Sequence, residues 1–119
     1  VFSIEGRVSL CLGSKGRGRG QLMNPQGLVV DRAGRYVVAD NGNHRVQGFA
    51  EDGSVAFVLG SEGREPGEFL EPQGLAIDHW GRLAVADSGN HRVQVFNPDL
   101  SIAYVLCRTR CIQVFAPGG

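Results

Sequence analysis

Residues 38–47 read VADNGNHRVQ and residues 85–94 read VADSGNHRVQ, so one ten-residue stretch occurs twice, 47 positions apart. A second pair precedes it, because residues 24–31 read NPQGLVVD and residues 71–78 read EPQGLAID. When residues 3–49 are laid over residues 50–96, 25 of the 47 positions are identical. Similarity at a fixed period of this length is the signature of a repeat architecture. Two copies of one unit therefore make up most of the chain.

Each repeat contains short apolar stretches separated by turn residues. Around the first copy they are residues 27–30, 36–39, 46–49 and 55–59. Each stretch is too short for a helix and rich in valine and aromatic residues, which favours β-strands. The gaps between them carry aspartate and glycine in the order typical of tight hairpin turns. Four antiparallel strands in roughly 40–50 residues predict one blade of a β-propeller, and so an all-β fold.

The repeats also set the expected domain boundaries. Residues 1–106 are predicted to form a partial β-propeller of two four-stranded antiparallel blades plus remnants of adjacent blades, with a third repeat starting at residue 97. Residues 107–119 depart from the period, and we expect an irregular tail or a truncated repeat, since CIQVF at 111–115 resembles RVQVF at 92–96. The chain opens on Val1 without a recognisable leader, so we expect an internal piece of a longer protein.

Composition sets weaker bounds. Twelve Lys+Arg balance twelve Asp+Glu, so any attraction to nucleic acid must come from a local patch. No apolar run reaches the roughly 18 residues of a membrane-spanning helix, and we expect no membrane contact. The three cysteines are irregularly spaced, which favours reduced thiols and a cytoplasmic location.

Strand direction predicts which loops share a face of the propeller. Because consecutive strands alternate in direction, the loop between the second and third strands lies on the same side as the loop between blades. In the first copy this side is basic, whereas the equivalent interblade loop of the second copy has four glutamates and one arginine. Arginine suits forked contacts to phosphate, so an RNA backbone is one candidate ligand, a protein is the other, and a merely solvated loop is the alternative. The candidate binding residues are Lys15, Arg17, Arg19, His44, Arg45, Arg64, His91 and Arg92.

The two histidines of the repeated stretch are expected to be structural. His44 and His91 recur with the same aspartate, glycine, asparagine and arginine around them, and a residue required in every repeat belongs to the turn rather than to one active site. Within that turn we expect Asp40 and Asp87 to accept backbone N–H bonds. We expect the left-handed conformation at Asn43 and Asn90, because asparagine tolerates it. We predict no catalytic residue, no metal site and no cofactor.

Trp80 is a secondary binding candidate. It stands in a turn beside His79, at the position that Ala33 occupies in the first repeat. An aromatic side chain on a loop anchors a protein partner or stacks on a base. The alternative is that it covers a neighbouring blade.

The repeated pattern, PQGLx[VI]D followed by [VA]VADxGNHRVQxF, resembles the NHL repeat over residues 1–106. It is similar to the propellers of TRIM-NHL proteins, which are ubiquitin ligases with a RING, B-boxes and a coiled coil upstream. The resemblance implies a non-catalytic recognition module that binds protein, or single-stranded or stem-loop RNA, through one propeller face. It also implies that the module serves a TRIM-type E3 ubiquitin ligase and packs against further blades of its parent chain. The alternative is a piece of an NHL-type propeller enzyme such as a peptide-amidating lyase, which would require paired cysteines and central metal-binding histidines.

Overall fold

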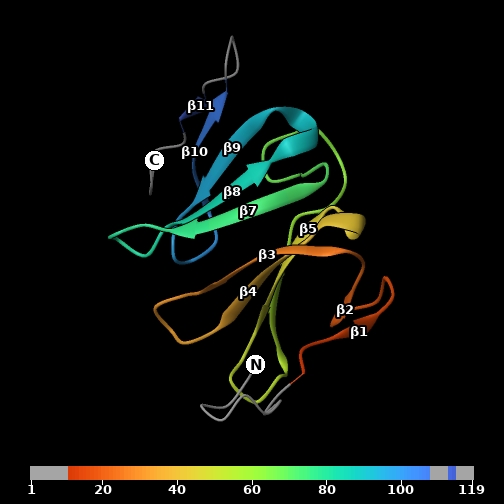
Figure 1. Ribbon diagram of the computed structural model, residues 1–119. Helices are drawn as coiled ribbons and strands as arrows, with labels where there is room; N and C mark the ends of the chain where they lie inside the picture. The colour runs from red at the N-terminus through yellow and green to blue at the C-terminus, as the bar shows by residue number, and fades with distance from the viewer. Residues whose placement is uncertain (1–10, 108–112, 115–119) are drawn as a thin grey trace.

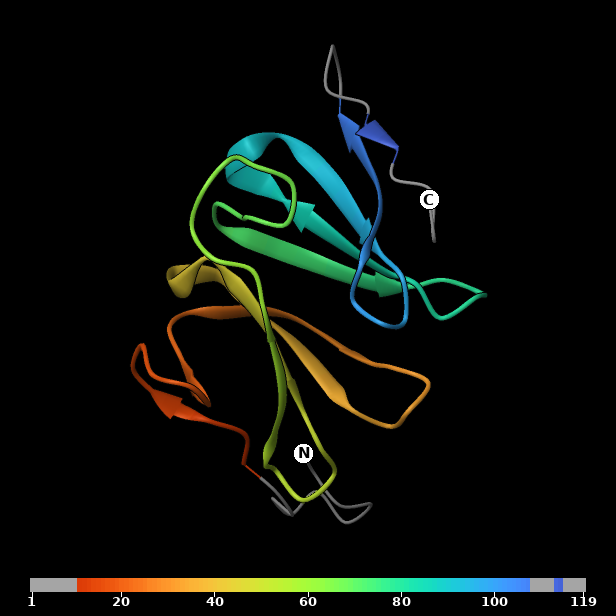
Figure 2. The same ribbon diagram turned by 180° about the vertical axis from the view of Figure 1, so that it is seen from behind.

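The computed structural model describes residues 11–107 and 113–114, and its two main antiparallel sheets stack as neighbouring blades (Figures 1 and 2). Blade 1 consists of β3 (Pro25–Val30), β4 (Tyr36–Asp40), β5 (Arg45–Phe49) and β6 (Val55–Leu59), in that order across the sheet. Blade 2 repeats this order with β7 (Pro72–Ile77), β8 (Leu83–Asp87), β9 (Arg92–Phe96) and β10 (Ile102–Cys107). The predicted all-β fold of a partial propeller with two four-stranded blades is confirmed.

The blades are out of phase with the sequence repeat by one strand. β6 lies in the second repeat, yet it pairs with β5 and forms the outer edge of blade 1. In the same way β10, which follows residue 96, pairs with β9 of blade 2. The second repeat thus begins with the outer strand of blade 1 and ends with the three inner strands of blade 2. Pro25 and Pro72 open their strands, as expected of a residue without a backbone N–H.

The core lies between the two blades. Val37 and Val46 of blade 1 pack with Leu83 and Val85 of blade 2, and all four are almost fully buried. Their strands alternate side chains between two sides, so every second residue points into this layer. Phe69, from the segment that connects the blades, is 0% exposed and packs in the same cluster. The interface is therefore a continuous apolar layer, as in other repeat proteins stabilised by neighbour contacts.

Each blade is buried on the side that faces the other blade and more exposed on its opposite side. Leu28 on β3 is 59% exposed, whereas its counterpart Leu75 is partly buried against the interblade core. On the opposite side, Val37 is buried by blade 2, whereas its counterpart Ala84 is only half-buried. A further blade on either side would give these residues the environment that their counterparts already have.

The end of the chain adds to blade 2. β11 (Gln113–Val114) pairs antiparallel with β10 and forms a fifth strand at the outer edge. The rest of the predicted tail and the predicted remnant before residue 11 lie outside the described residues. Cys107 is disulfide-bonded, which corrects the expectation of three reduced thiols, and Cys11 is an exposed free thiol. No helix in the described ranges has the length and apolarity needed to cross a membrane.

Candidate functional site

The strand ends define two faces of the pair of blades. The loop face carries the β4–β5 and β8–β9 connections, with the 3-10 helices η1 (Asn41–Asn43) and η2 (Ser88–Asn90), and the loops that enter each blade, residues 13–22 and 60–71. The first of these loops contains β1 (Ser14–Lys15) and β2 (Gln21–Leu22), which pair in parallel. The hairpin face carries the turns at residues 31–35, 50–54, 78–82 and 97–101. In Figure 1 the β3–β4 and β7–β8 turns lie at the left, and the loop face at the right.

A buried carboxylate anchors the loop of residues 13–22 to blade 1. Asp40 is 0% exposed, and its Oδ1 accepts the backbone N–H of Met23 at 2.7 Å. Its Oδ2 accepts Arg45 Nε at 2.7 Å, Asn43 Nδ2 at 3.0 Å and Gln47 Nε2 at 3.2 Å. Blade 2 repeats every one of these bonds around Asp87 (from Leu70, Arg92, Asn90 and Gln94). The repeated Asp-Asn-Arg-Gln pattern therefore fastens each loop to its own blade, because a buried charge must be fully hydrogen-bonded.

The two arginines of this network hold loop backbone as well as aspartate. Arg45 also donates to the carbonyls of Gly18 and Gln21, both at 2.8 Å, and its side chain is 13% exposed. Arg92 donates to three carbonyls of the second loop and is 9% exposed. Both were candidate ligand contacts in the sequence, but the structure uses their guanidinium groups to shape the loops.

His44 links the two blades. It has a φ of 54°, and its Nδ1 accepts the backbone N–H of Glu71 at the start of blade 2, at 3.0 Å. Its Nε2 lies 4.0 Å from Glu62 Oε2. The prediction for Asn43 was wrong, because Asn43 closes the 3-10 helix and the following residue takes the left-handed conformation that ends it. The prediction for Asp40 needs a similar correction, since the N–H that it accepts comes from the entering loop and not from the turn.

His91 repeats the geometry of His44 without the contact. Its φ is 55°, its side chain is exposed, and no hydrogen bond to its imidazole is found in residues 11–107 and 113–114. Within the same ranges no group of three or more His, Cys, Asp or Glu side chains is placed to hold a metal ion.

The basic loop, residues 13–22, exposes three cations. Lys15, Arg17 and Arg19 are all exposed, and none forms an ion pair with a carboxylate in the described part of the chain. The loop is held by backbone bonds such as Gly16 N–H to Leu22 O at 3.1 Å, and by the network around Asp40. Because these bonds fix the loop backbone without using the three cations, the cationic side chains can contact a ligand.

The acidic loop, residues 60–71, has the same fold and the opposite charge. Gly63 N–H donates to Phe69 O at 3.1 Å, the counterpart of the bond that closes the basic loop. Glu62 occupies the position of Lys15, and Glu65 and Glu71 are exposed beside it. Arg64, a candidate contact from the sequence, is exposed among these glutamates. The loop face therefore places a basic loop on blade 1 next to an acidic loop on blade 2.

The hairpin face carries Trp80, which is 66% exposed. Arg82 lies over its ring, 4.9 Å from the centroid, and the ring of His79 meets it edge-on at 5.4 Å. The turn itself is held by Asp78, whose Oδ2 accepts Arg82 Nε at 2.5 Å. Loss of hydration alone would raise the pKa of Asp78, but hydrogen bonds from the backbone and side chain of Arg82 and from the N–H of Trp80 hold that pKa below its ordinary value.

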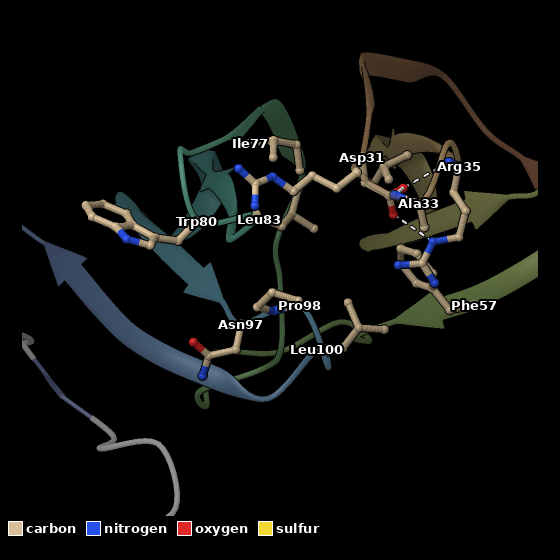
Figure 3. Close-up of a pocket in the computed structure, with 13 residues that line it drawn as sticks. Asp31, Ala33, Arg35, Phe57, Ile77, Trp80, Leu83, Asn97, Pro98 and Leu100 are labelled. Carbon is tan, nitrogen blue, oxygen red and sulfur yellow. Dashed lines mark hydrogen bonds and ion pairs between the residues drawn. The ribbon is translucent and has the colours of Figure 1, made fainter.

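A pocket of about 390 Å³ opens between the blades on the hairpin face (Figure 3). Trp80 lies on one side of it, and Arg35 with Phe57 lies on the other. Sequence reasoning singled out Trp80 but missed this pocket. The available signal was the middle of the turn, where Arg32 and Ala33 become His79 and Trp80 while the flanking aspartate, glycine and arginine stay the same.

Comparisons with known proteins agree with the geometry. The family model of the NHL repeat matches residues 22–49 and 69–96. The chain is 49% identical over 43 residues to Protein lin-41 of Caenorhabditis elegans, covering 36% of this chain and 4% of that protein. It is 46% identical over 44 residues to E3 ubiquitin-protein ligase TRIM71 of Mus musculus, covering 37% of this chain and 5% of that protein. The chain thus spans only a small part of these relatives.

A solved structure of a Bacteroides fragilis protein matches the fold with a TM-score of 0.69. The match covers 82% of this chain and 28% of the other, at 19% identity, so it speaks for the fold alone. The two matched segments each end at the last residue of a third strand, and each contains the aspartate network of its blade. Two NHL repeats in this chain form neighbouring blades of a partial β-propeller, and over about a third of its length the chain is similar to TRIM-NHL proteins.

Proposed function

We propose that this chain is the target-recognition part of a cytoplasmic TRIM-type E3 ubiquitin ligase, and that its basic loop binds RNA through the phosphate backbone. The repeats supply a rigid platform rather than a reactive group. The assignment of RNA as the ligand depends on a single observation. In the basic loop, Lys15, Arg17 and Arg19 are exposed without an acidic partner among the described residues.

The way in which the loop is held supports a binding role. Its backbone is fixed by Arg45, Gln47 and Asp40, so the loop would lose little conformational freedom when a ligand binds. The cations themselves project from this frame. Contacts to phosphate position a nucleic acid without reading its sequence, and three cations can supply a few such contacts. We therefore expect an affinity that depends strongly on salt and weakly on sequence.

The acidic loop would respond differently to an RNA ligand and to a protein ligand. Phosphate would be repelled by Glu62, Glu65 and Glu71 on blade 2 and attracted by blade 1. An RNA should therefore lie along the basic loop and away from blade 2. A protein ligand with both charges would span both loops, and it would respond to changes in either.

The RNA proposal is tested by charge reversal in the full chain. The variant Lys15→Glu, Arg17→Glu, Arg19→Glu should bind a single-stranded RNA oligonucleotide and an RNA stem-loop at least about tenfold more weakly at low salt. It should also flatten the slope of log affinity against log salt by about two, as expected for about three lost phosphate contacts. Binding is measured by fluorescence anisotropy.

The matched control is Arg64→Glu, which reverses one charge on the acidic loop and should leave RNA affinity within about twofold. Equal affinity of the triple variant and the unchanged chain at low salt would overturn the RNA proposal. Equal weakening by Arg64→Glu would mean that the RNA contacts both loops, which would overturn the proposed path along the basic loop alone.

The ligase part of the proposal needs a separate measurement on the whole parent protein. Purified parent protein should transfer ubiquitin to itself in the presence of activating and conjugating enzymes. Deleting both blades should leave this self-modification and abolish modification of a co-purified target. A parent protein that transfers no ubiquitin would overturn the ligase assignment while leaving the RNA result standing.

A further inference from the structure

We infer that the pocket between the blades on the hairpin face is a second recognition site, which takes an apolar side chain of an extended acidic peptide. This interblade pocket lies on the opposite face from the basic loop and uses none of its residues. The inference therefore stands apart from the proposed RNA contact.

The floor of the interblade pocket is apolar and its rim is polar. Val37, Phe57 and Leu83 line it from the interblade core, and each is at most 9% exposed. Arg32 and Asn97 line it from two turns of the hairpin face. A cavity of about 390 Å³ with an apolar floor and a few polar groups is typical of sites that bind a side chain or a small ligand.

The charge at the rim favours an acidic partner. Asp31 is neutralised by Arg35, with Nε–Oδ2 at 2.6 Å, and Arg35 also lies over the ring of Phe57 at 5.0 Å. Arg32 forms no ion pair in the described part of the chain, and its Nη2 donates to the carbonyl of His79 across the blade junction. The carbonyl fixes the position of this guanidinium without cancelling its charge. A peptide with a carboxylate next to an apolar side chain would place the carboxylate near Arg32 and the apolar side chain on the pocket floor.

Trp80 supplies the exposed wall. Its ring is held by Arg82 on one side and by His79 at an edge, yet it is 66% exposed. The fold does not require this side chain, because the counterpart turn in blade 1 is built with Ala33 and keeps the same hydrogen bonds. A fixed aromatic side chain left in solvent is the kind of residue that dominates protein–protein binding energy. Arg32, which has no ion pair among the described residues, lines the same pocket and bonds to the carbonyl of His79, the residue before Trp80.

The test uses Trp80 as its own reporter, since it is the only tryptophan of the chain. The probe is a blocked pentapeptide with a phenylalanine between two aspartates, added to the full chain. We expect a saturable change in tryptophan fluorescence, and a peptide with serines in place of the aspartates should bind about fivefold more weakly, as for a partly exposed ion pair. A peptide with alanine in place of phenylalanine should give no saturable change.

Two variants assign the contacts, with binding measured by calorimetry so that the tryptophan is not needed. Arg32→Gln should bind the aspartate and serine peptides equally, and Trp80→Ala should lose saturable binding of both. Both residues are exposed, and circular dichroism confirms that the variants keep the fold. The control is the charge-reversed basic loop, which should bind the aspartate peptide unchanged.

Three results would overturn the inference. The first is the absence of saturable binding in both fluorescence and calorimetry. The second is loss of peptide binding in the basic-loop variant, which would place the peptide on the loop face. The third is a Trp80 fluorescence change caused by RNA and abolished by Arg32→Gln, which would make the pocket a nucleic-acid site. Conversely, Trp80→Ala should leave RNA binding intact, so that each proposal fails on its own.

Discussion

The imidazole Nδ1 of His44 accepts the backbone N–H of Glu71 at 3.0 Å, so the turn of one blade is hydrogen-bonded to the residue that precedes the first inner strand of the next. Asn41 adds a second link, because its Nδ2 donates to Pro72 O at 3.1 Å. Both bonds leave one turn and end at the same short segment. The repeated turn therefore does two things: it holds the loop of its own blade, and it aligns the neighbouring blade.

Glycine substitution at the two histidines should separate the interblade bond from backbone strain. His44→Gly and His91→Gly both relieve a left-handed residue, which costs about 1–2 kcal/mol for a side chain with a Cβ. Only His44→Gly also removes a described hydrogen bond, whose net contribution is about 0.5–1.5 kcal/mol. We expect His91→Gly to be the more stable variant by about 1 kcal/mol in urea unfolding. Equal free energies would mean that the bond to Glu71 contributes nothing.

Alanine at Gly27 should disturb the blade interface, whereas alanine at its counterpart should not. A Cβ on Gly27 would lie 2.4 Å from Gln73 O of the facing strand, whereas a Cβ on Gly74 meets nothing closer than Ala86 Cβ at 3.5 Å. We expect Gly27→Ala to lower the free energy of unfolding by about 1–3 kcal/mol. Gly74→Ala should change it by about 0.5 kcal/mol or less, or stabilise slightly. If Gly74→Ala proves equally destabilising, another chain segment covers that strand.

Removing the charge of a buried aspartate should be among the most damaging single changes. In Asp87→Asn the guanidinium of Arg92, only 9% exposed, would lose its carboxylate partner. Leaving one member of a buried ion pair costs about 3–5 kcal/mol, and the acidic loop would lose its anchor. We expect this variant to show no cooperative unfolding transition in urea. The control Glu65→Gln alters an exposed carboxylate and should change the free energy by about 0.5 kcal/mol or less.

Acid should weaken the hairpin turns through their aspartates. Hydrogen bonds from the Ser54 hydroxyl lower the pKa of Asp52, and those from the Ser101 hydroxyl lower the pKa of Asp99. A carboxylate with a lowered pKa in the folded state contributes stability that is fully present above its ordinary value of 3.8 and lost as the pH falls below it. Below about pH 4, the free energy of unfolding should therefore decrease. In the variant Ser54→Ala, Ser101→Ala this fall should be shallower, and an unchanged slope would contradict the assignment.

Two blades could be predicted from the sequence because a propeller blade is specified locally. The VADxGNHRVQ stretch contains two strand segments and the turn between them, and its aspartate, second asparagine, arginine and glutamine bond within one blade and its entering loop. Repetition favoured a structural role for the histidines, and the structure places His44 at the blade junction. The positions and charges of the basic and acidic loops could also be predicted, because the positions follow from strand direction and the charges follow from the residues of each loop.

The roles of Arg45 and Arg92 needed the tertiary structure. Nothing in their sequence context separates them from Arg17 or Arg64, yet the fold buries the first two beneath a loop and leaves the other two in solvent. The interblade pocket needed it as well, because its lining comes from turns and strands far apart in the chain. By itself the sequence determined the repeating strands, the turns and the charge of each loop, since these depend on neighbours along the chain. Burial and cavities depend on packing between blades, and this only the folded arrangement decided.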